Sequence, residues 1–124
     1  MHMEISVGLK NKTEKKVEFK DTAAALGSGF VEVLATPMMI AVMEGTCAAC
    51  VSEYLPEGYS TVGTHVNVSH KASVAVGETY MTSCELIEID RKKLTFKVRA
   101  YKDEKTIGEG THERFIIDVY KFMK

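Results

Sequence analysis

The sequence predicts an α+β fold in which an antiparallel β-sheet wraps one long apolar helix. Three observations carry this prediction. Residues 36–54 form an almost uncharged stretch with helix start and stop signals, and residues 59–120 then alternate apolar and polar side chains with a period of two. No helical pattern recurs between the alternating segments. Because parallel strands need long crossovers, usually helices, a doubly wound parallel sheet is excluded.

The first thirty residues give weaker signals. Short apolar alternations favour strands over 4–9 and 16–19, and Asp21 is expected to cap a brief helical turn that Gly27 ends. The opening residues 1–2 resemble a cloning remnant and are set aside from the fold prediction. Because 124 residues are too few for two domains, the whole chain, 1–124, is expected to be one domain.

The long helix has a clear start and a clear end. A Thr36 oxygen can cap the free amides of the first turn, and Pro37 suits the first helical position. The helix should run to about Tyr54 and stop before Pro56. Since apolar residues occupy all its sides, it must be covered by a sheet, a partner chain or both.

The second half of the chain predicts long strands in hairpin order. Residues 94–101 alternate strictly, which makes one face buried and the other wet. Similar patterns predict strands over 61–68, 78–89 and 106–120. The apolar side chains of the clearest strand are Leu94, Phe96, Val98 and Ala100, and the turn-like segments between strands are 75–77, 90–92 and 102–104.

Composition narrows the class of protein. With 124 residues, 45% of them hydrophobic, the chain can bury a core without metal or disulfides. A net charge of −1 provides no single-signed field for nucleic acid or an anionic membrane, so neither partner is expected.

Residues 33–52 could span a bilayer by length, but Pro37, Glu44 and Gly45 favour a buried helix of a soluble protein. Three cysteines, with no leading apolar segment, indicate free thiols and a cytoplasmic location.

Glu44 is the only formal charge in residues 33–52. On a helical wheel it shares a face with Ile40, Cys47 and Val51, so its carboxylate should lie among apolar neighbours. Removing an unpaired carboxylate from water is costly, which leaves two explanations. Glu44 is kept for chemistry, or it is a structural carboxylate paired with an arginine or histidine, or reaching solvent at a dimer seam.

Other candidate side chains have simpler explanations beside the functional ones. His65 and His112 are expected to be hydrogen-bonded structural residues, whereas His70 ends a strand where a loop begins, a common place for catalytic groups. The amides after Thr36 offer an oxyanion site. Cys47 and Cys50 have metal or redox spacing but no second pair, so buried core thiols are expected, and no metal or cofactor.

Four separated motifs then occur in order. They are Thr36-Pro37 opening the helix that holds Glu44, Thr61-Val62-Gly63-Thr64, Val68-Ser69-His70, and Gly108-Glu109-Gly110-Thr111-His112-Glu113-Arg114. From about Phe30 to Asp118 the chain resembles the hotdog-fold thioesterases similar to fluoroacetyl-CoA thioesterase. The resemblance implies a hotdog fold, an antiparallel sheet around one long central helix.

The resemblance also implies a site. The family's catalytic threonine, glutamate and histidine fall on Thr36, Glu44 and His70. Substrate-binding positions fall on Gly63, which lies near the thioester carbonyl, and on Phe30, Thr64 and Arg114. The family forms homodimers whose sheets join edge to edge, with acyl-CoA entering near the interface, and a dimer of dimers is left open.

The implied chemistry is hydrolysis of an acyl-CoA to the free acid and CoA. Glu44 would attack the thioester carbonyl or activate a water, His70 would act as acid and base, and Thr36 would orient the reacting groups. Phe30 fits one position of the family's lid, but the small residues of 23–29 before it differ. We therefore expect a general short-chain acyl-CoA thioesterase.

Two other functions stay open on the sequence alone. A non-catalytic hotdog domain that binds acyl-CoA would use Glu44 and His70 as a structural pair. A hotdog hydratase would need an Asp-rich, His-containing segment, which the sequence lacks.

Overall fold

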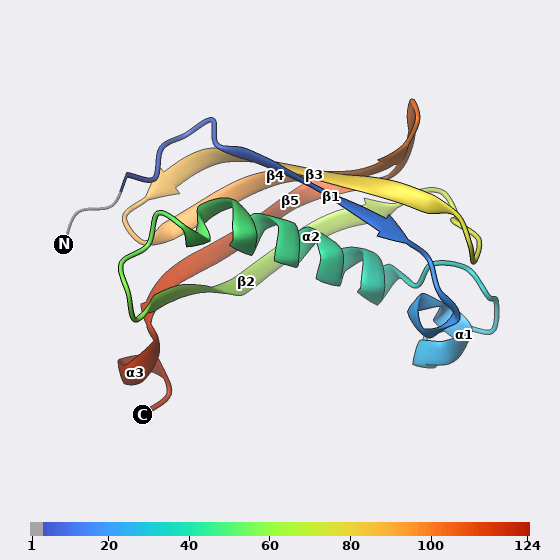
Figure 1. Cartoon of the computed structure of the whole chain (residues 1–124), viewed down its shortest axis with the longest axis horizontal. Coiled ribbons are helices and arrows are strands. Elements are labelled where there is room, and N and C mark those ends of the chain that lie inside the picture. Colours follow the sequence, from blue (N-terminus) through green and yellow to red (C-terminus); the bar gives the residue numbers. More distant parts are fainter. Residues whose placement is uncertain (1–3) are drawn as a thin grey trace.

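A five-stranded antiparallel sheet curves around the long helix α2 (Thr36–Ser52) in the computed structural model, which describes residues 4–124 (Figure 1). The strand order is β1-β3-β4-β5-β2, so β1 and β2 form the two edges of the sheet. The strands are β1 (Lys10–Lys16), β2 (Tyr59–His70), β3 (Thr79–Asp90), β4 (Lys93–Lys102) and β5 (Lys105–Asp118). The predicted fold class is confirmed, and residues 1–2 lie outside the described residues.

The four strands of the second half lie within a few residues of the predicted ranges. Strand β4 shows why, because Leu94, Phe96, Val98 and Ala100 are all buried against the helix side of the sheet, as the alternation predicts. Truncation of Phe96 to alanine would cost about 3–5 kcal/mol of folding free energy. A period of two with one apolar face therefore predicts strand β4 from its own residues.

The N-terminal strand predictions were wrong. Residues 4–9 form no strand, and β1 pairs with β3 from Lys10 opposite Glu85 to Lys16 opposite Thr79. Its sequence is polar because it is an edge strand, where lysines face water. Its inward side chains hydrogen-bond to the long helix instead of forming an apolar face: Asn11 donates to the Thr46 carbonyl, and the Thr13 and Thr46 hydroxyls lie 2.7 Å apart.

Two short helices precede α2. They are the 3₁₀ helix η1 (Phe19–Asp21) and α1 (Ala23–Leu26), which ends at Gly27 with a positive φ, as predicted. The cap of α1 is Thr22, whose hydroxyl accepts from the Ala25 amide, and not Asp21. The Asp21 carboxylate is instead buried, accepts a hydrogen bond from the Glu18 amide, and forms an ion pair with Lys15.

Helix α2 begins at the predicted residue, but its cap differs from the prediction. The N-cap is Ala35, so the Thr36 hydroxyl is not used for capping. The helix ends at Ser52, two residues before the predicted end. One face, including Met39, Met43 and Cys47, is buried under the sheet. The opposite face is open in the single chain, where the exposed residues include Pro37, Ala41, Gly45, Ala49 and Ser52.

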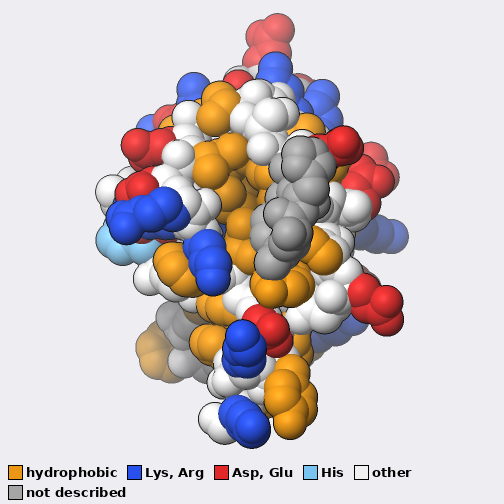
Figure 2. All heavy atoms as spheres, turned by 90° about the vertical axis from the view of Figure 1, so that its left-hand side faces the viewer, with side chains coloured by type: hydrophobic (Ala, Val, Ile, Leu, Met, Phe, Trp, Pro, Cys, Tyr) orange, Lys and Arg blue, Asp and Glu red, His pale blue; other side chains and the backbone are white. Residues whose placement is uncertain are grey.

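Strand β5 is followed by the last helix, α3 (Val119–Phe122), at the end of the molecule that also carries the C-terminus. Hydrophobic side chains reach the surface at this end of the molecule (Figure 2). Tyr120, Phe122 and Met123 are among the most exposed apolar residues of the described chain. Within residues 4–124, no helix is both long and apolar enough to cross a membrane.

Candidate active site

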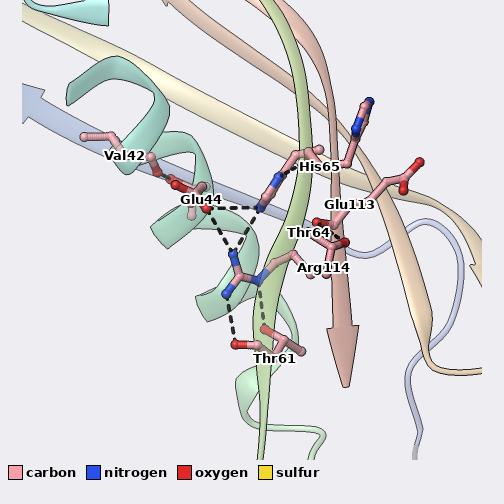
Figure 3. Close-up of polar contacts among 9 residues, drawn as sticks. Val42, Glu44, Thr61, Thr64, His65, Glu113 and Arg114 are labelled. Carbon is pink, nitrogen blue, oxygen red and sulfur yellow. Dashed lines mark hydrogen bonds and ion pairs between the residues drawn. The ribbon is translucent and has the colours of Figure 1, made fainter. Parts of the chain in front are cut away.

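Glu44 lies in the middle of α2, with its carboxylate directed at β2 and β5 (Figure 3). Its Oε2 is 3.9 Å from Nη1 of Arg114 and 4.0 Å from Nε2 of His112, and its side chain is 39% exposed. The expectation that this carboxylate lies among apolar neighbours was therefore wrong, and Glu44 instead faces an arginine and a histidine, as the structural explanation allowed. Glu44 lies at the boundary between the covered and the open faces of the helix, next to the exposed Gly45, where it faces a buried cation.

Arg114 is the cation of this group and is only 7% exposed on β5. Its Nε donates to Oγ1 of Thr61 at 2.8 Å, and its Nη2 donates to the Thr61 carbonyl at 3.0 Å (Figure 3). Burial lowers the pKa of the Arg114 guanidinium, and the nearby Glu44 acts in the opposite direction. The group remains protonated in proteins, so a fixed positive charge faces Glu44.

His112 completes the surroundings of Arg114. It is 1% exposed, its Nδ1 lies 2.8 Å from the His65 carbonyl, and its Nε2 lies 3.0 Å from Nη1 of Arg114. Burial lowers its pKa, which favours the neutral imidazole. From the sequence, His112 was expected to be only a hydrogen-bonded structural residue. The available signal was its spacing of two from Arg114, which places both on one face of a strand.

Gly63 on β2 lies directly against this group. A Cβ added there would lie 2.5 Å from Oε2 of Glu44, 3.1 Å from Cε1 of His112 and 3.3 Å from Nη1 of Arg114. Only glycine permits this approach, and the register of β2 against β5 shifts just after it. We refer to Glu44, Thr61, Gly63, His112 and Arg114 as the Glu44 cluster.

A second group forms at the start of α2. The Thr36 hydroxyl and Nδ1 of His70 lie 2.7 Å apart, which joins the helix start to the end of β2. Together with Val33, Lys71, Ala72 and Ser73 they line an open depression in the surface. Thr36 is exposed, while Nε2 of His70 is buried and lacks a hydrogen-bond partner among the described residues. We refer to these two residues as the Thr36–His70 pair.

The two groups are far apart within one chain. Thr36 and Glu44 are eight residues apart on α2, which corresponds to about 12 Å along the helix axis. Gly63 and His70 are seven residues apart on β2, roughly 23 Å in an extended strand. The structure thus brings Glu44, Gly63 and Arg114 together, and separately Thr36 and His70.

Two predicted binding residues belong to neither group. Phe30 lies on the segment between α1 and α2 with a fully exposed side chain, so it packs against neither. Thr64 follows Gly63 on β2, and its hydroxyl donates to the Glu113 carbonyl.

Comparison with known proteins identifies the family. Residues 17–120 match the model of the fluoroacetyl-CoA-specific thioesterases. The chain belongs to this family. Fluoroacetyl-CoA thioesterase of Streptantibioticus cattleyicolor is 37% identical over 93 residues, which cover 75% of this chain and 67% of that protein. The predicted resemblance is confirmed, and the family makes the chain a thioester hydrolase.

Solved structures agree with this family membership. A structure of the fluoroacetyl-CoA thioesterase FlK matches with a TM-score of 0.90 at 31% identity, over 96% of this chain and 93% of that one. A thioesterase superfamily member from Thermus thermophilus matches with a TM-score of 0.87 at 26% identity, over 96% and 88% of the two chains. A hot-dog-like protein from Thermanaerovibrio acidaminovorans, at 20% identity, has a TM-score of 0.87 and covers 94% and 87%. The predicted hotdog fold is confirmed.

The cysteines of this thioesterase are core residues, as predicted. Cys47, Cys50 and Cys84 are free and buried. A hydrogen bond to Cys84, together with burial, raises the pKa of the Cys47 thiol, and burial raises the pKa of Cys50 to about 12. Neither is a thiolate nucleophile at neutral pH. Residues 4–124 contain no group of three or more side chains arranged to hold a metal ion.

Proposed function

We propose that this thioesterase hydrolyses short-chain acyl-CoA to the free acid and CoA, with Glu44 as the group that acts on the thioester carbonyl. The observation that carries the proposal is the environment of the Glu44 carboxylate. It is partly exposed, lies 3.9 Å from a buried guanidinium, and accepts no hydrogen bond from the described residues. A carboxylate with a cation nearby and free lone pairs is suited to act as a nucleophile or base.

The chemistry can follow either of two routes. In the first, an oxygen of Glu44 attacks the thioester carbonyl, the C–S bond breaks, and water then hydrolyses the resulting anhydride. In the second, Glu44 takes a proton from a water that attacks the carbonyl directly. In both, the Gly63 amide or the first-turn amides of α2 would stabilise the negative oxygen, and the products are the acid and CoA.

The Thr36–His70 pair would serve the leaving group. The hydrogen bond of 2.7 Å fixes the imidazole relative to the helix start. From there His70 would protonate the departing CoA thiolate or activate the second water, and Thr36 would orient the carbonyl or the carboxylate. Both roles require the pair to lie beside a Glu44 carboxylate, which the separation within one chain does not allow.

A homodimer resolves this separation. The open face of α2 contains Gly45, whose added Cβ would meet nothing in the single chain, although glycine in a helix costs about 1 kcal/mol relative to alanine. Small residues on this face permit a second helix to approach closely. Antiparallel pairing about a twofold axis near residue 40 of α2, and near residues 66–67 of the β2 edge, would place Glu44 of one chain beside Thr36 and His70 of the other.

The activity is tested with a panel of acyl-CoA substrates. Acetyl-, propionyl-, butyryl-, fluoroacetyl- and aryl-acyl-CoA are incubated with purified protein, and free CoA thiol is measured. We expect hydrolysis of one or more of the short-chain substrates. Binding of these compounds with thiol release at the background rate would instead support the non-catalytic acyl-CoA-binding domain, in which Glu44 serves only to neutralise Arg114.

The shared site is tested by mixing two inactive variants. A heterodimer of Glu44→Gln and His70→Ala chains contains one site with both wild-type residues if each site draws on two chains. After unfolding and refolding together, random pairing should restore roughly a quarter of wild-type activity, since half of the dimers are mixed and each has one intact site. Absence of any recovery, in dimers shown to have mixed, would place both groups of a site on one chain.

A further inference from the structure

The hydrogen bonds around His112 fix its protonation. The His65 carbonyl can only accept, so Nδ1 of His112, 2.8 Å away, carries the proton and donates. Nη1 of Arg114 can only donate, so Nε2 of His112, 3.0 Å away, is the unprotonated acceptor. The imidazole is therefore neutral, in its Nδ1–H form. The 4.0 Å approach of Nε2 to Glu44 thus joins two acceptors and is not an ion pair.

The same bonds restrain Arg114. Its Nε and Nη2 each donate to Thr61, and Nη1 donates to His112, so every nitrogen of the guanidinium has a fixed acceptor. Nη1 remains 3.9 Å from Oε2 of Glu44. A charge-assisted hydrogen bond between such groups measures about 2.7–2.9 Å. Arg114 therefore supplies a positive charge to Glu44 without a direct hydrogen bond to it.

We propose that His112 is a positioning residue of the thioesterase site, whose Nε2 holds Arg114 back from Glu44 so that the lone pairs of the carboxylate stay free to react. This inference rests on the proposed role of Glu44. Without an acceptor at Nε2, a buried N–H of Arg114 would lack a partner, and Glu44 is the nearest carboxylate to it. A close Arg114–Glu44 salt bridge would occupy the lone pair that attacks the thioester or takes the proton.

Two substitutions test the roles of the two ring nitrogens of His112 separately. Asparagine places an amide N–H near the position of Nδ1, where it can donate to the His65 carbonyl, but it does not reach Arg114. Glutamine places an amide oxygen near the position of Nε2, where it can accept from Arg114. Both replace an aromatic ring with a smaller amide in the same buried place, so each is the packing control for the other.

The kinetic test compares these variants on the best substrate of the panel. We expect His112→Asn to lower kcat at least roughly tenfold with KM changed much less, because the lost interaction acts on the reacting carboxylate. His112→Gln should recover most of that loss. Equal losses in both variants, or a loss confined to KM, would overturn the positioning role. Thermal unfolding of each variant establishes that the comparison is made between folded proteins.

The protonation of the His112 ring and the restraint of the Arg114 guanidinium can both be measured without an assay of activity. In ¹⁵N spectra of histidine-labelled protein at neutral pH, the His112 ring, assigned by its absence in His112→Gln, should show a protonated Nδ1 and an unprotonated Nε2. In ¹⁵N spectra of arginine, rotation of the Arg114 guanidinium should be slow in wild type and His112→Gln and faster in His112→Asn. A protonated Nε2, or rotation that is alike in all three proteins, would overturn the proposal.

These readouts distinguish the two proposals from each other. A wild-type protein that hydrolyses no acyl-CoA, but shows the expected ring protonation and the expected rotation rates, would remove the proposed function and leave His112 as the residue that holds Arg114. An active enzyme with a protonated Nε2 would do the reverse.

Discussion

The two halves of the proposed site are built in opposite ways. In the Glu44 cluster, Arg114 and His112 are almost fully buried, and every nitrogen of the guanidinium has an acceptor. In the Thr36–His70 pair, a single hydrogen bond joins an exposed threonine to a histidine whose second nitrogen has no partner among the described residues. Several hydrogen bonds within one chain fix the side chains of the Glu44 cluster, whereas one hydrogen bond fixes the Thr36–His70 pair.

This difference follows from where each half lies. The Glu44 cluster lies between the middle of the helix and the two strands β2 and β5, where the sheet packs closely against α2 and charge must be paired. The Thr36–His70 pair lies at the end of the helix and of an edge strand, where one chain provides few neighbours. The first half is preorganised within one chain, whereas in the proposed homodimer the second half would be completed by substrate and a second chain.

Replacing Glu44, the proposed reactive group of the preorganised half, should have the largest effect. Glu44→Gln keeps the shape of the side chain but removes its charge, so kcat should fall by at least roughly a hundredfold, the usual scale for a nucleophile or general base. Turnover is measured by thiol release, and gel filtration and thermal unfolding check the assembly and the fold. Wild-type turnover in a folded Glu44→Gln protein would remove Glu44 from the mechanism.

Gly63→Ala should have the next largest effect. The added methyl group would lie 2.5 Å from Oε2 of Glu44, so the carboxylate must move away from its place beside Arg114. We expect kcat to fall roughly tenfold or more, since small misplacements of a reacting group are costly. The control is Ser60→Ala, an exposed position on the same strand, which should leave turnover near wild type. If Gly63→Ala retained full activity, the cluster would be less rigid than its contacts indicate.

Changes to the less determined half should be smaller. Thr36→Val removes the hydroxyl at nearly constant volume and leaves Nδ1 of His70 without its partner, so we expect a loss in kcat of about tenfold. Thr36→Ser retains the hydroxyl and should recover most of the activity. A loss in Thr36→Val as large as that in Glu44→Gln would contradict the contrast between the halves.

The smallest expected effect is on the pH dependence of stability. Because burial lowers the pKa of His112 in the folded protein, the unfolded chain takes up a proton below about pH 6.5 that the folded chain does not. The stability of the wild type should therefore fall as the pH drops below this value, until the folded-state pKa is reached. The charged groups that face His112 are Arg114, Glu44 and Glu113.

This prediction is checked by comparing melting temperatures of wild type and His112→Gln from about pH 7 to about pH 5. The other titrating groups are shared by both proteins, so the wild type should lose more stability over this range. Parallel curves would mean that His112 accepts a proton in the folded state and that its environment is less restrictive than the hydrogen bonds indicate.

Most of the sheet could be predicted because its signals are local. The alternation in 94–101 and the uncharged stretch of α2 required no knowledge of neighbouring elements, and the structure confirms both. Strand β1 could not be predicted in this way, because its polar inner residues are satisfied by Thr46, far away in the sequence. The cap was misjudged for the same reason, since the partner of Thr36 is His70 and not the helix backbone.

By itself the sequence determined the long apolar helix with one carboxylate, the four strands that follow it, and the four motifs that resemble the family. Only the tertiary structure decided that Glu44 faces Arg114, that Arg114 donates to His112, and that Thr36 and His70 form a separate group. Periodicity depends on a residue's own neighbours, which the sequence contains. The protonation and charge of a buried group depend on the few atoms that long-range packing brings within about 4 Å of it.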